Sequence, residues 1–276
     1  LVFYDPRHRG RSDALRDSTL ATFTGDVTDL EAVRAALGLG RFALVGFDYL
    51  AGVVTAYAAE HPARVSRLIL LSPTEPTDSL ARAWNPPERM ARLDTTDARA
   101  LVKMRAAGRD TSDAEAYCRA YWRVNAVVYV GDVSRAGLVH PDWCALPNET
   151  PARLAAQAAL VFASLGPEAN LAAAAARVTV PTLVIHGDRD LIASAEGARA
   201  WVRRIPGARL WMVAGAGHLA LVEANDLVVR AMAAFLGGTW PDGSGPTPSA
   251  GAFLVPQSSY ISPPGLSRGS ASHGRP

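Results

Sequence analysis

The chain has 276 residues, of which 49% are hydrophobic and 20% charged, and its formal net charge is +2. This profile is typical of a globular protein and excludes a chain that is disordered throughout. No apolar run reaches the roughly 18 residues of a membrane span, and the arginines are scattered, so neither a membrane nor a nucleic acid is a predicted partner.

The first 73 residues alternate apolar runs with helical patterns. Strands are predicted at residues 1–4, 41–47 and 64–73, and helices at residues 25–40 and 49–62. The first helix is expected to begin at Asp26 as its N-cap and to stop at Gly38 or Gly40. The apolar runs lack alternation, as parallel strands do when helices cover both faces. This part of the chain therefore indicates an α/β fold.

The middle of the chain, residues 74–176, breaks this rhythm. It is mostly helical in character, rich in Trp and Tyr, and too long for a loop, so it predicts an inserted helical cap. Cys118 and Cys144 lie in it without CxxC spacing and without a His at metal-ligand spacing. We therefore expect two ordinary buried thiols and no metal or redox site.

Strands and helices resume at residue 177, so residues 1–73 and 177–236 form the predicted core. Strands are expected within 178–190 and 208–218, and helices near 195–204 and within 223–237. More than half of residues 237–276 are Gly, Pro or Ser. Such a segment cannot bury enough apolar surface to offset its ordering entropy, and a disordered tail is predicted.

Three predicted turns each carry a chemically active side chain. Asp48 follows the strand "RFALVGF", Asp190 follows "TLVIHG", and His218 follows "LWMVAGAG". In open α/β sheets, ligands bind at the carboxyl ends of the strands, so these three groups are expected to converge. Their order along the chain is nucleophile, acid, His.

The same segments resemble the α/β-hydrolase fold superfamily. "VFYDPRHRGRSD" resembles the strand and turn before the nucleophile, "LVGFDYLAGVV" the nucleophile elbow, "PTLVIHGDRD" the acid strand and "GAGH" the His loop. The resemblance covers residues 1–73 and 177–236. It implies an α/β-hydrolase fold with a mostly parallel sheet, flanking helices and an inserted cap, and it places the acid at Asp190 in preference to Asp188.

The elbow departs from the commonest pattern, in which a Ser nucleophile has a glycine two places to either side. Gly46 is present, but the nucleophile position is Asp48 and the second glycine position is Leu50. Ala51 and Gly52 are expected to supply the small side chains that the tight turn needs.

An Asp nucleophile resembles that of the epoxide hydrolases and haloalkyl dehalogenases of this fold. A carboxylate is ionised at neutral pH without help from a base, so Asp48 could attack a saturated carbon and form an ester that water, activated by His218, then hydrolyses. The resemblance implies the Tyr49 backbone N–H as an oxyanion donor, and Tyr117 and Tyr121 as cap groups that aid the leaving group. A small apolar substrate is predicted, with no cofactor and no metal.

Two alternatives stay open at this stage. One is a catalytically degenerate binding protein of the same fold, in which Asp48 replaces a nucleophilic Ser. The other is a hydrolase in which His218 and Asp190 act on water without a covalent step. Because Leu1 already lies within a predicted strand, the N-terminal strands of the family, including the second oxyanion loop, are expected to be missing. A cytoplasmic location is predicted because no signal segment is visible.

Overall fold

The computed structural model of the protein describes residues 1–13, 17–76, 85–146, 148–164 and 170–245. Its centre is a four-stranded parallel sheet in the order β1-β2-β3-β4. The strands are β1 (Phe42–Phe47), β2 (Val65–Leu71), β3 (Thr182–Gly187) and β4 (Arg209–Val213). All six residues of β3 are buried, as continuous apolar runs in a covered parallel sheet should be. The predicted α/β fold with a parallel sheet is confirmed.

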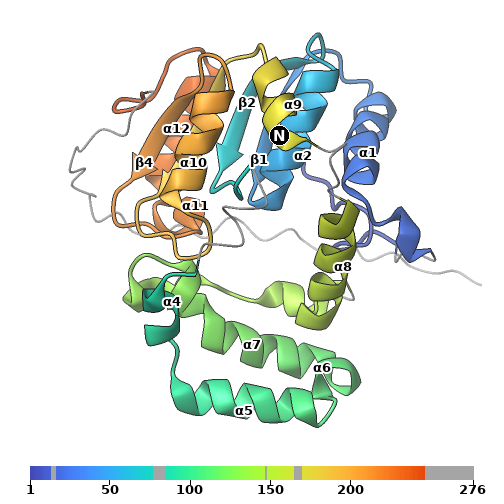
Figure 1. Cartoon of the computed structure of the whole chain (residues 1–276), viewed down its shortest axis with the longest axis vertical. Coiled ribbons are helices and arrows are strands. Elements are labelled where there is room, and N and C mark those ends of the chain that lie inside the picture. Colours follow the sequence, from blue (N-terminus) through green and yellow to red (C-terminus); the bar gives the residue numbers. More distant parts are fainter. Residues whose placement is uncertain (14–16, 77–84, 147, 165–169, 246–276) are drawn as a thin grey trace, which may run out of the picture.

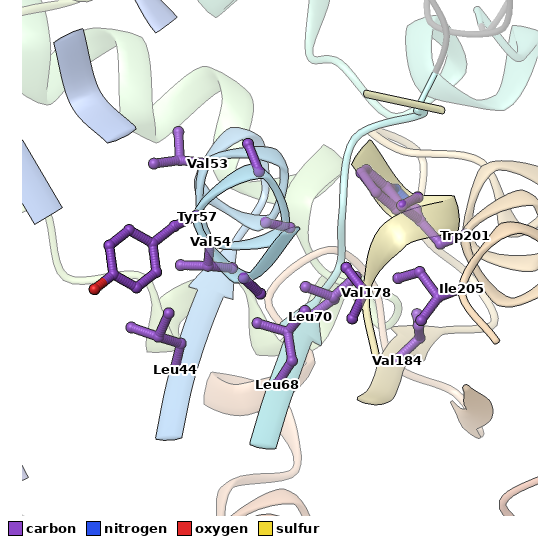
Figure 2. Close-up of a cluster of buried hydrophobic side chains, with 14 of the residues drawn as sticks. Leu44, Val53, Val54, Tyr57, Leu68, Leu70, Val178, Val184, Trp201 and Ile205 are labelled. Carbon is purple, nitrogen blue, oxygen red and sulfur yellow. The ribbon is translucent and has the colours of Figure 1, made fainter. Parts of the chain in front are cut away.

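Helices cover both faces of this sheet. One face packs against α1 (Phe23–Ala36), α2 (Tyr49–Glu60), α9 (Leu171–Arg177) and α10 (Ala195–Arg204), and Figure 2 shows the core between them. The other face packs against α11 (Ala220–Glu223) and α12 (Asn225–Leu236). Successive residues of β2 alternate between the two cores, with Leu68 and Leu70 in the first and Ile69 and Leu71 in the second.

The outer strand β1 has one exposed side. Val45 and Phe47 on β1 are 37% and 38% exposed, although the alternate residues on this strand are buried. Residues 1–4 were predicted to form a strand, and this prediction is wrong, because they belong to no strand of the sheet and Leu1 and Phe3 are almost fully exposed. A strand needs a hydrogen-bonding neighbour, and no described segment pairs with these residues.

The cap helices lie together beyond one end of the sheet (Figure 1). They are α4 (Pro87–Ala91), α5 (Thr95–Ala106), α6 (Arg109–Ser112), α7 (Ala114–Tyr129) and α8 (Pro151–Ser164), with the 3-10 turns η2 (Val133–Leu138) and η3 (Asp142–Ala145) between α7 and α8. Another 3-10 turn, η1 (Ser18–Leu20), precedes α1. Helix α9 contacts α2 and α10 and lies beside the core, although the predicted cap range includes most of it. The predicted division of the chain stays a prediction.

The N-cap of α1 is Thr22 and not Asp26 as predicted. The Thr22 side chain accepts a hydrogen bond from the Gly25 N–H, which satisfies one of the free donors of the first turn. Asp26 lies inside the helix, is buried, and accepts a 2.7 Å hydrogen bond from the Tyr49 hydroxyl. Thr22 and Asp26 both suit a helix start, and the structure separates them because Thr22 accepts the capping hydrogen bond whereas Asp26 accepts one from Tyr49.

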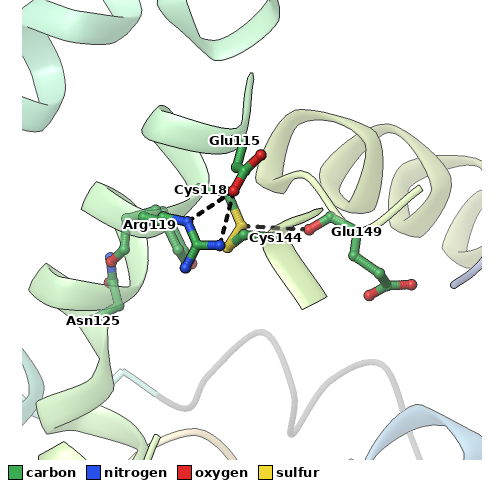
Figure 3. The surroundings of a disulfide bond; sticks show 7 residues. Glu115, Cys118, Arg119, Asn125, Cys144 and Glu149 are labelled. Atoms are coloured by element: carbon green, nitrogen blue, oxygen red, sulfur yellow. Dashed lines mark hydrogen bonds and ion pairs between the residues drawn. A yellow bond between two sulfur atoms is a disulfide. The ribbon is translucent and has the colours of Figure 1, made fainter. Parts of the chain in front are cut away.

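Cys118 and Cys144 form a disulfide, so the prediction of two free thiols is wrong. The bond joins α7 to η3, with the two Cα atoms 5.6 Å apart, and both residues are buried (Figure 3). The cysteines are 26 residues apart in the chain, and only the fold of the cap brings them together.

The start of the predicted tail is ordered over residues 237–245. Gly245 forms an antiparallel bridge with Leu210 on β4, and the Trp240 ring packs against Phe235 and under the Arg209 guanidinium. Residues 246–276 lie outside the described residues. Among the helices that the structure describes, none is long and apolar enough to cross a membrane.

The junction of β1 and α2 depends on a close approach of backbone at Gly46. A Cβ atom at this position would lie 2.5 Å from the Leu50 carbonyl oxygen and 2.8 Å from the Ala51 Cα. Leu50 itself is only partly buried and packs at the edge of the first core. The turn therefore needs small residues at Gly46 and Ala51, and it accepts a large side chain at Leu50.

We predict that Gly46→Ala lowers the free energy of unfolding by about 1–3 kcal/mol, because the added methyl group meets backbone that cannot move aside. Urea unfolding monitored by circular dichroism measures the change. Gly40→Ala is the matched control, since a Cβ there meets nothing within 4 Å. Equal stability of the two variants would contradict the close-approach argument.

Candidate active site

Asp48 occupies the sharp turn between β1 and α2. Its backbone has φ +51° and ψ −123°, a left-handed conformation that is costly for a residue with a side chain. The turn is held by hydrogen bonds from the Asp48 N–H to the Leu71 carbonyl at 3.0 Å and from the Ala51 N–H to the Asp48 carbonyl at 3.1 Å. Such stored strain at a strand-to-helix turn is a feature of nucleophile elbows.

His218 and Asp190 form a buried pair at the carboxyl ends of the neighbouring strands. His218 Nδ1 lies 2.8 Å from Asp190 Oδ2. The other oxygen, Oδ1, accepts hydrogen bonds from the backbone N–H groups of Ile192 and Ala193 at 2.7 and 2.9 Å. Asp188, the alternative acid, instead accepts a hydrogen bond from the Gly215 N–H in an exposed turn. The geometry thus makes Asp190 the partner of His218.

The free ring nitrogen of His218 faces Asp48. His218 Nε2 lies 3.9 Å from Asp48 Oδ1, and neither of these buried atoms has a hydrogen-bond partner within the described structure. The Asp48 side chain is 37% exposed, because its outer part opens into a cavity. Two unsatisfied polar atoms across a gap of this width are suited to bind a reacting group or a water molecule between them.

The charges of these three residues are coupled. Burial raises the pKa of Asp48, and His218 partly offsets the rise. Burial alone would lower the pKa of His218, but attraction from Asp190, their hydrogen bond and the nearby Asp48 together raise it. Burial works against ionisation of Asp190 as well, and attraction to His218 outweighs it and lowers the pKa of Asp190. The resting site therefore favours an ionised Asp190 beside a protonated His218.

A second histidine, His186, lies behind the pair on β3. It is fully buried, and its Nε2 is 3.7 Å from Asp190 Oδ2, too far for a hydrogen bond. Burial lowers the pKa of His186, so this ring is neutral. It fills space around Asp190 without competing for the proton of His218.

A cavity of about 790 Å³ leads from Asp48 between the core and the cap. Aromatic residues of α7 and small residues of α8 line this cavity. These lining residues include Tyr117, Tyr121, Trp122 and Tyr129 on α7, and Ala152, Ala155, Ala156 and Ala158 on α8. All the tyrosines named from the sequence, Tyr49, Tyr117 and Tyr121, line the cavity.

Tyr129 is the α7 tyrosine beside the His218–Asp190 pair. Its ring packs edge-on against the His218 ring at 5.7 Å between centroids. Burial raises the pKa of Tyr129, and Tyr121 and Asp48 raise it further. Tyr117 lies toward the other end, where Arg105 and Asp110 act on its hydroxyl. The sequence pattern favoured Tyr117 and Tyr121 for their helical spacing, with Tyr129 only close by, and the contact of Tyr129 with His218 depends on how the end of α7 packs on the core.

Tyr49 contributes to the site in two ways. Its backbone N–H is close enough to the Asp48 carboxylate to lower the pKa of that group, opposing the effect of burial. Its hydroxyl is held away from the reacting atoms by the hydrogen bond to Asp26. The role of the Tyr49 N–H as an oxyanion donor stays a prediction, and the Tyr49 residue forms part of the cavity wall.

The cavity is further enclosed by an ion pair that the sequence did not reveal. Arg9 contacts Glu149 through bonds of 2.9 and 3.1 Å, and the Gly10 N–H donates to the same carboxylate at 2.8 Å. Glu149 follows Cys144 in the chain, so the disulfide and this ion pair together fix the segment that leads into α8. No group of three His, Cys, Asp or Glu side chains in the described residues could hold a metal ion.

Comparison with known proteins agrees with this arrangement. A family model described as the alpha/beta hydrolase fold matches residues 1–225. The chain belongs to the α/β-hydrolase fold family. This hydrolase has the same fold as an esterase from Exiguobacterium antarcticum, with a TM-score of 0.59 and 20% identity over 85% of this chain and 80% of that one. The enol-lactonase from Burkholderia xenovorans is similar, with a TM-score of 0.61 and 22% identity over 85% and 79%.

Similarity to curated proteins covers shorter segments. The chain is 43% identical to the proline iminopeptidase PfmaB of Pestalotiopsis fici over 54 residues, which are 20% of this hydrolase and 19% of that protein. It is 31% identical to the polyketide synthase ThaQ of Burkholderia thailandensis over 109 residues, and these make up 40% of this chain and 5% of the synthase. The hydrolase thus spans only a small part of these relatives.

We predict that Asp190→Asn lowers the pKa of His218, because the strongest attraction on its proton is lost while burial still disfavours the charged ring. Titration of the His218 ring by NMR measures this. A pKa that is raised in the folded protein stabilises the fold below the unfolded pKa of about 6.5, and this stabilisation is lost as the pH rises through the pKa of His218 in the folded protein. The variant should lose much of this stabilisation. Asp188→Asn is the control, and an equal change in His218 there would contradict the assignment of the acid.

Proposed function

We propose that the protein is a hydrolase with an Asp nucleophile that attacks a saturated carbon of an epoxide or a haloalkyl compound. The observation that carries this proposal is Asp48 on a strained elbow, 3.9 Å from the free nitrogen of a His218 that is bound to Asp190. An intact acid and base beside a carboxylate support catalysis over a degenerate binding site. Attack of a carboxylate on an ester would give a reactive mixed anhydride, so esterase chemistry suits Asp48 less well.

The proposed reaction has two steps. Asp48 forms a carbon–oxygen bond to the substrate, and either a halide leaves or an epoxide oxygen opens and takes a proton from a cap tyrosine. His218 then removes a proton from water, and the hydroxide attacks the Asp48 carbonyl carbon of the ester. The tetrahedral intermediate expels the alcohol, which receives the proton from His218. The proton that remains on Asp48 returns to the cap tyrosine in the epoxide reaction, or passes to solvent in the haloalkyl reaction, and the Asp48 carboxylate is restored. Tyr129, which packs on His218, is the cap tyrosine best placed to serve the opening oxygen, with Tyr121 next to it.

The covalent step can be tested with His218→Gln, which leaves the nucleophile in place and removes the base. We expect incubation with terminal epoxides and 1-bromoalkanes to add the mass of the substrate to Asp48, as measured by intact-protein and peptide mass spectrometry. Asp48→Asn is the matched control and should form no adduct at this position. Bound ligand without any adduct across the panel would instead indicate a binding protein.

A second measurement separates the covalent route from direct attack by water. One turnover in H₂¹⁸O, with enzyme in excess, should leave ¹⁸O in the Asp48 peptide, because water attacks the ester carbonyl. The product of that turnover should carry oxygen from Asp48 and no label. Labelled product and unlabelled Asp48 would mean that His218 and Asp190 act on water directly.

The cavity supports a substrate with a flat, uncharged body. Its volume of about 790 Å³ lies in the range of sites that bind drug-sized molecules. Tyr121 and Trp122 line the same cavity as the alanines of α8, and we infer that they leave a slot between them that would take a ring. The cations at its two ends are paired, Arg9 with Glu149 and Arg105 with Asp110, so neither favours a charged substrate.

We predict that glycidyl phenyl ether is turned over with a higher kcat/KM than glycidyl cyclohexyl ether, by roughly 10-fold, because only the flat ring can stack in the slot. Ala155→Trp should abolish this preference by filling the slot. Ala159→Trp is the control, since Ala159 is exposed on the same helix but does not line the cavity. Equal rates for both ethers in the wild-type protein would contradict the proposed shape.

The cytoplasmic location predicted from the sequence remains a proposal, and it competes with the disulfide. Disulfides persist mainly in oxidising compartments. Alkylation of free thiols before cell lysis, followed by mass spectrometry of the Cys118 and Cys144 peptides, decides between them. Alkylated cysteines would support a reducing compartment, and an intact bond would support an oxidising one.

A further inference from the structure

Glu223 is a buried carboxylate that the proposed reaction does not use. It lies at the end of α11 and is 7% exposed. Its Oε2 accepts a hydrogen bond from the Gly217 N–H at 2.6 Å. Its Oε1 accepts one from the Gly131 N–H at 2.8 Å and a longer one from the Asp132 N–H. One side chain thus binds two backbone segments that are far apart in the sequence.

Each of these segments carries a group of the site. Gly217 directly precedes His218, and Gly131 follows the end of α7, two residues after Tyr129. The segments also contact each other, since the Leu219 N–H donates to the Tyr129 carbonyl at 3.1 Å. The carboxylate therefore lies where the end of α7 and the His218 loop contact each other, close to Asp48.

The two backbones approach too closely for any side chain at the crossing. A Cβ at Gly131 would lie 2.2 Å from the Gly215 carbonyl oxygen, and a Cβ at Gly217 would lie 2.5 Å from the Gly131 nitrogen. Each N–H that is buried by this contact needs an acceptor, and Glu223 supplies it. Arg135 in η2 also donates to the Glu223 carbonyl at 2.6 Å, which ties α11 to the cap.

We propose that Glu223 is a positioning residue that holds His218 and Tyr129 in register across this crossing. Because both of its oxygens are bonded, the Glu223 side chain links the loop that carries His218 to the end of α7 that carries Tyr129. The relative position of the two rings then depends on this link as well as on the packing of the cap against the core. The proposal rests on the proposed function for the roles of His218 and Tyr129, and its structural part can be tested without turnover.

The variant Glu223→Gln provides the test. The amide oxygen can accept from only one of the two glycine N–H groups, and the amide NH₂ then faces the other donor. We expect kcat to fall roughly 10- to 100-fold with little change in KM, because the reacting groups lose their alignment while the cavity walls stay in place. Glu196→Gln is the control, since Glu196 is exposed and pairs only with surface arginines.

A double-mutant cycle with Tyr129→Phe distinguishes positioning from general stability. If Glu223 acts through the register of Tyr129, then Glu223→Gln should cost clearly less in the Tyr129→Phe background than in the wild type. The same fold-loss in both backgrounds would overturn the proposal. Should Glu223→Gln not fold, Arg135→Ala weakens the same junction more mildly and should give a smaller loss in the same direction.

A readout without substrate separates this proposal from the chemistry of Asp48. In the wild-type protein the Tyr129 and His218 rings should give NMR cross-peaks, and these should weaken in Glu223→Gln while the fold and the disulfide remain. Unchanged cross-peaks and an unchanged His218 titration would overturn the positioning role. Weakened cross-peaks in a protein that never forms an adduct on Asp48 would support the clamp and reject the proposed function.

Discussion

The hydrogen bond between His218 and Asp190 is the interaction around which the site is built. Both groups are buried, and an isolated charge in that position would be costly, so each depends on the other and on the two backbone donors that bind Asp190. A pair of this kind adds little net stability. Its effect is to fix the ring of His218 with Nε2 directed at Asp48, the second carboxylate of the site.

The strained backbone of Asp48 is held by hydrogen bonds of the sheet and not by contacts among the side chains of the site. The Asp48 N–H donates to the carbonyl of Leu71, at the end of the neighbouring strand β2. The hydroxyl of the next residue, Ser72, donates to the His218 carbonyl at 2.7 Å. The elbow and the His loop are thus anchored on the same strand, β2. The disulfide and the Arg9–Glu149 ion pair fix the cap separately, and Glu223 joins the two halves. Rigid elements on both sides of the cavity leave little freedom for the groups that face it.

The sequence predicted what depends on local pattern. Continuous apolar runs located the sheet, and the turns after those runs located Asp48, Asp190 and His218, because parallel strands bring their carboxyl ends to one edge. Contacts across long separations were not predictable in the same way. The Cys118–Cys144 bond and the role of Glu223 depend on how the cap folds back, and no short-range pattern encodes that. Thr22 and Asp26 both suit a helix start, and their roles differ only through their contacts: Thr22 accepts the capping hydrogen bond from Gly25, and Asp26 accepts one from Tyr49.

Under the proposed function, Asp48 in place of a Ser would change the charges of the site during the reaction as well as its nucleophile. His218 lies between two carboxylates, and both raise its pKa. In the proposed reaction, ester formation would remove the charge of Asp48, so one of these two attractions would be lost and the pKa of His218 would fall. The ring would then act as a base at the stage where water must be activated. Asp190 alone would hold His218 in position at both stages, and the change from acid to base would follow from the covalent step itself.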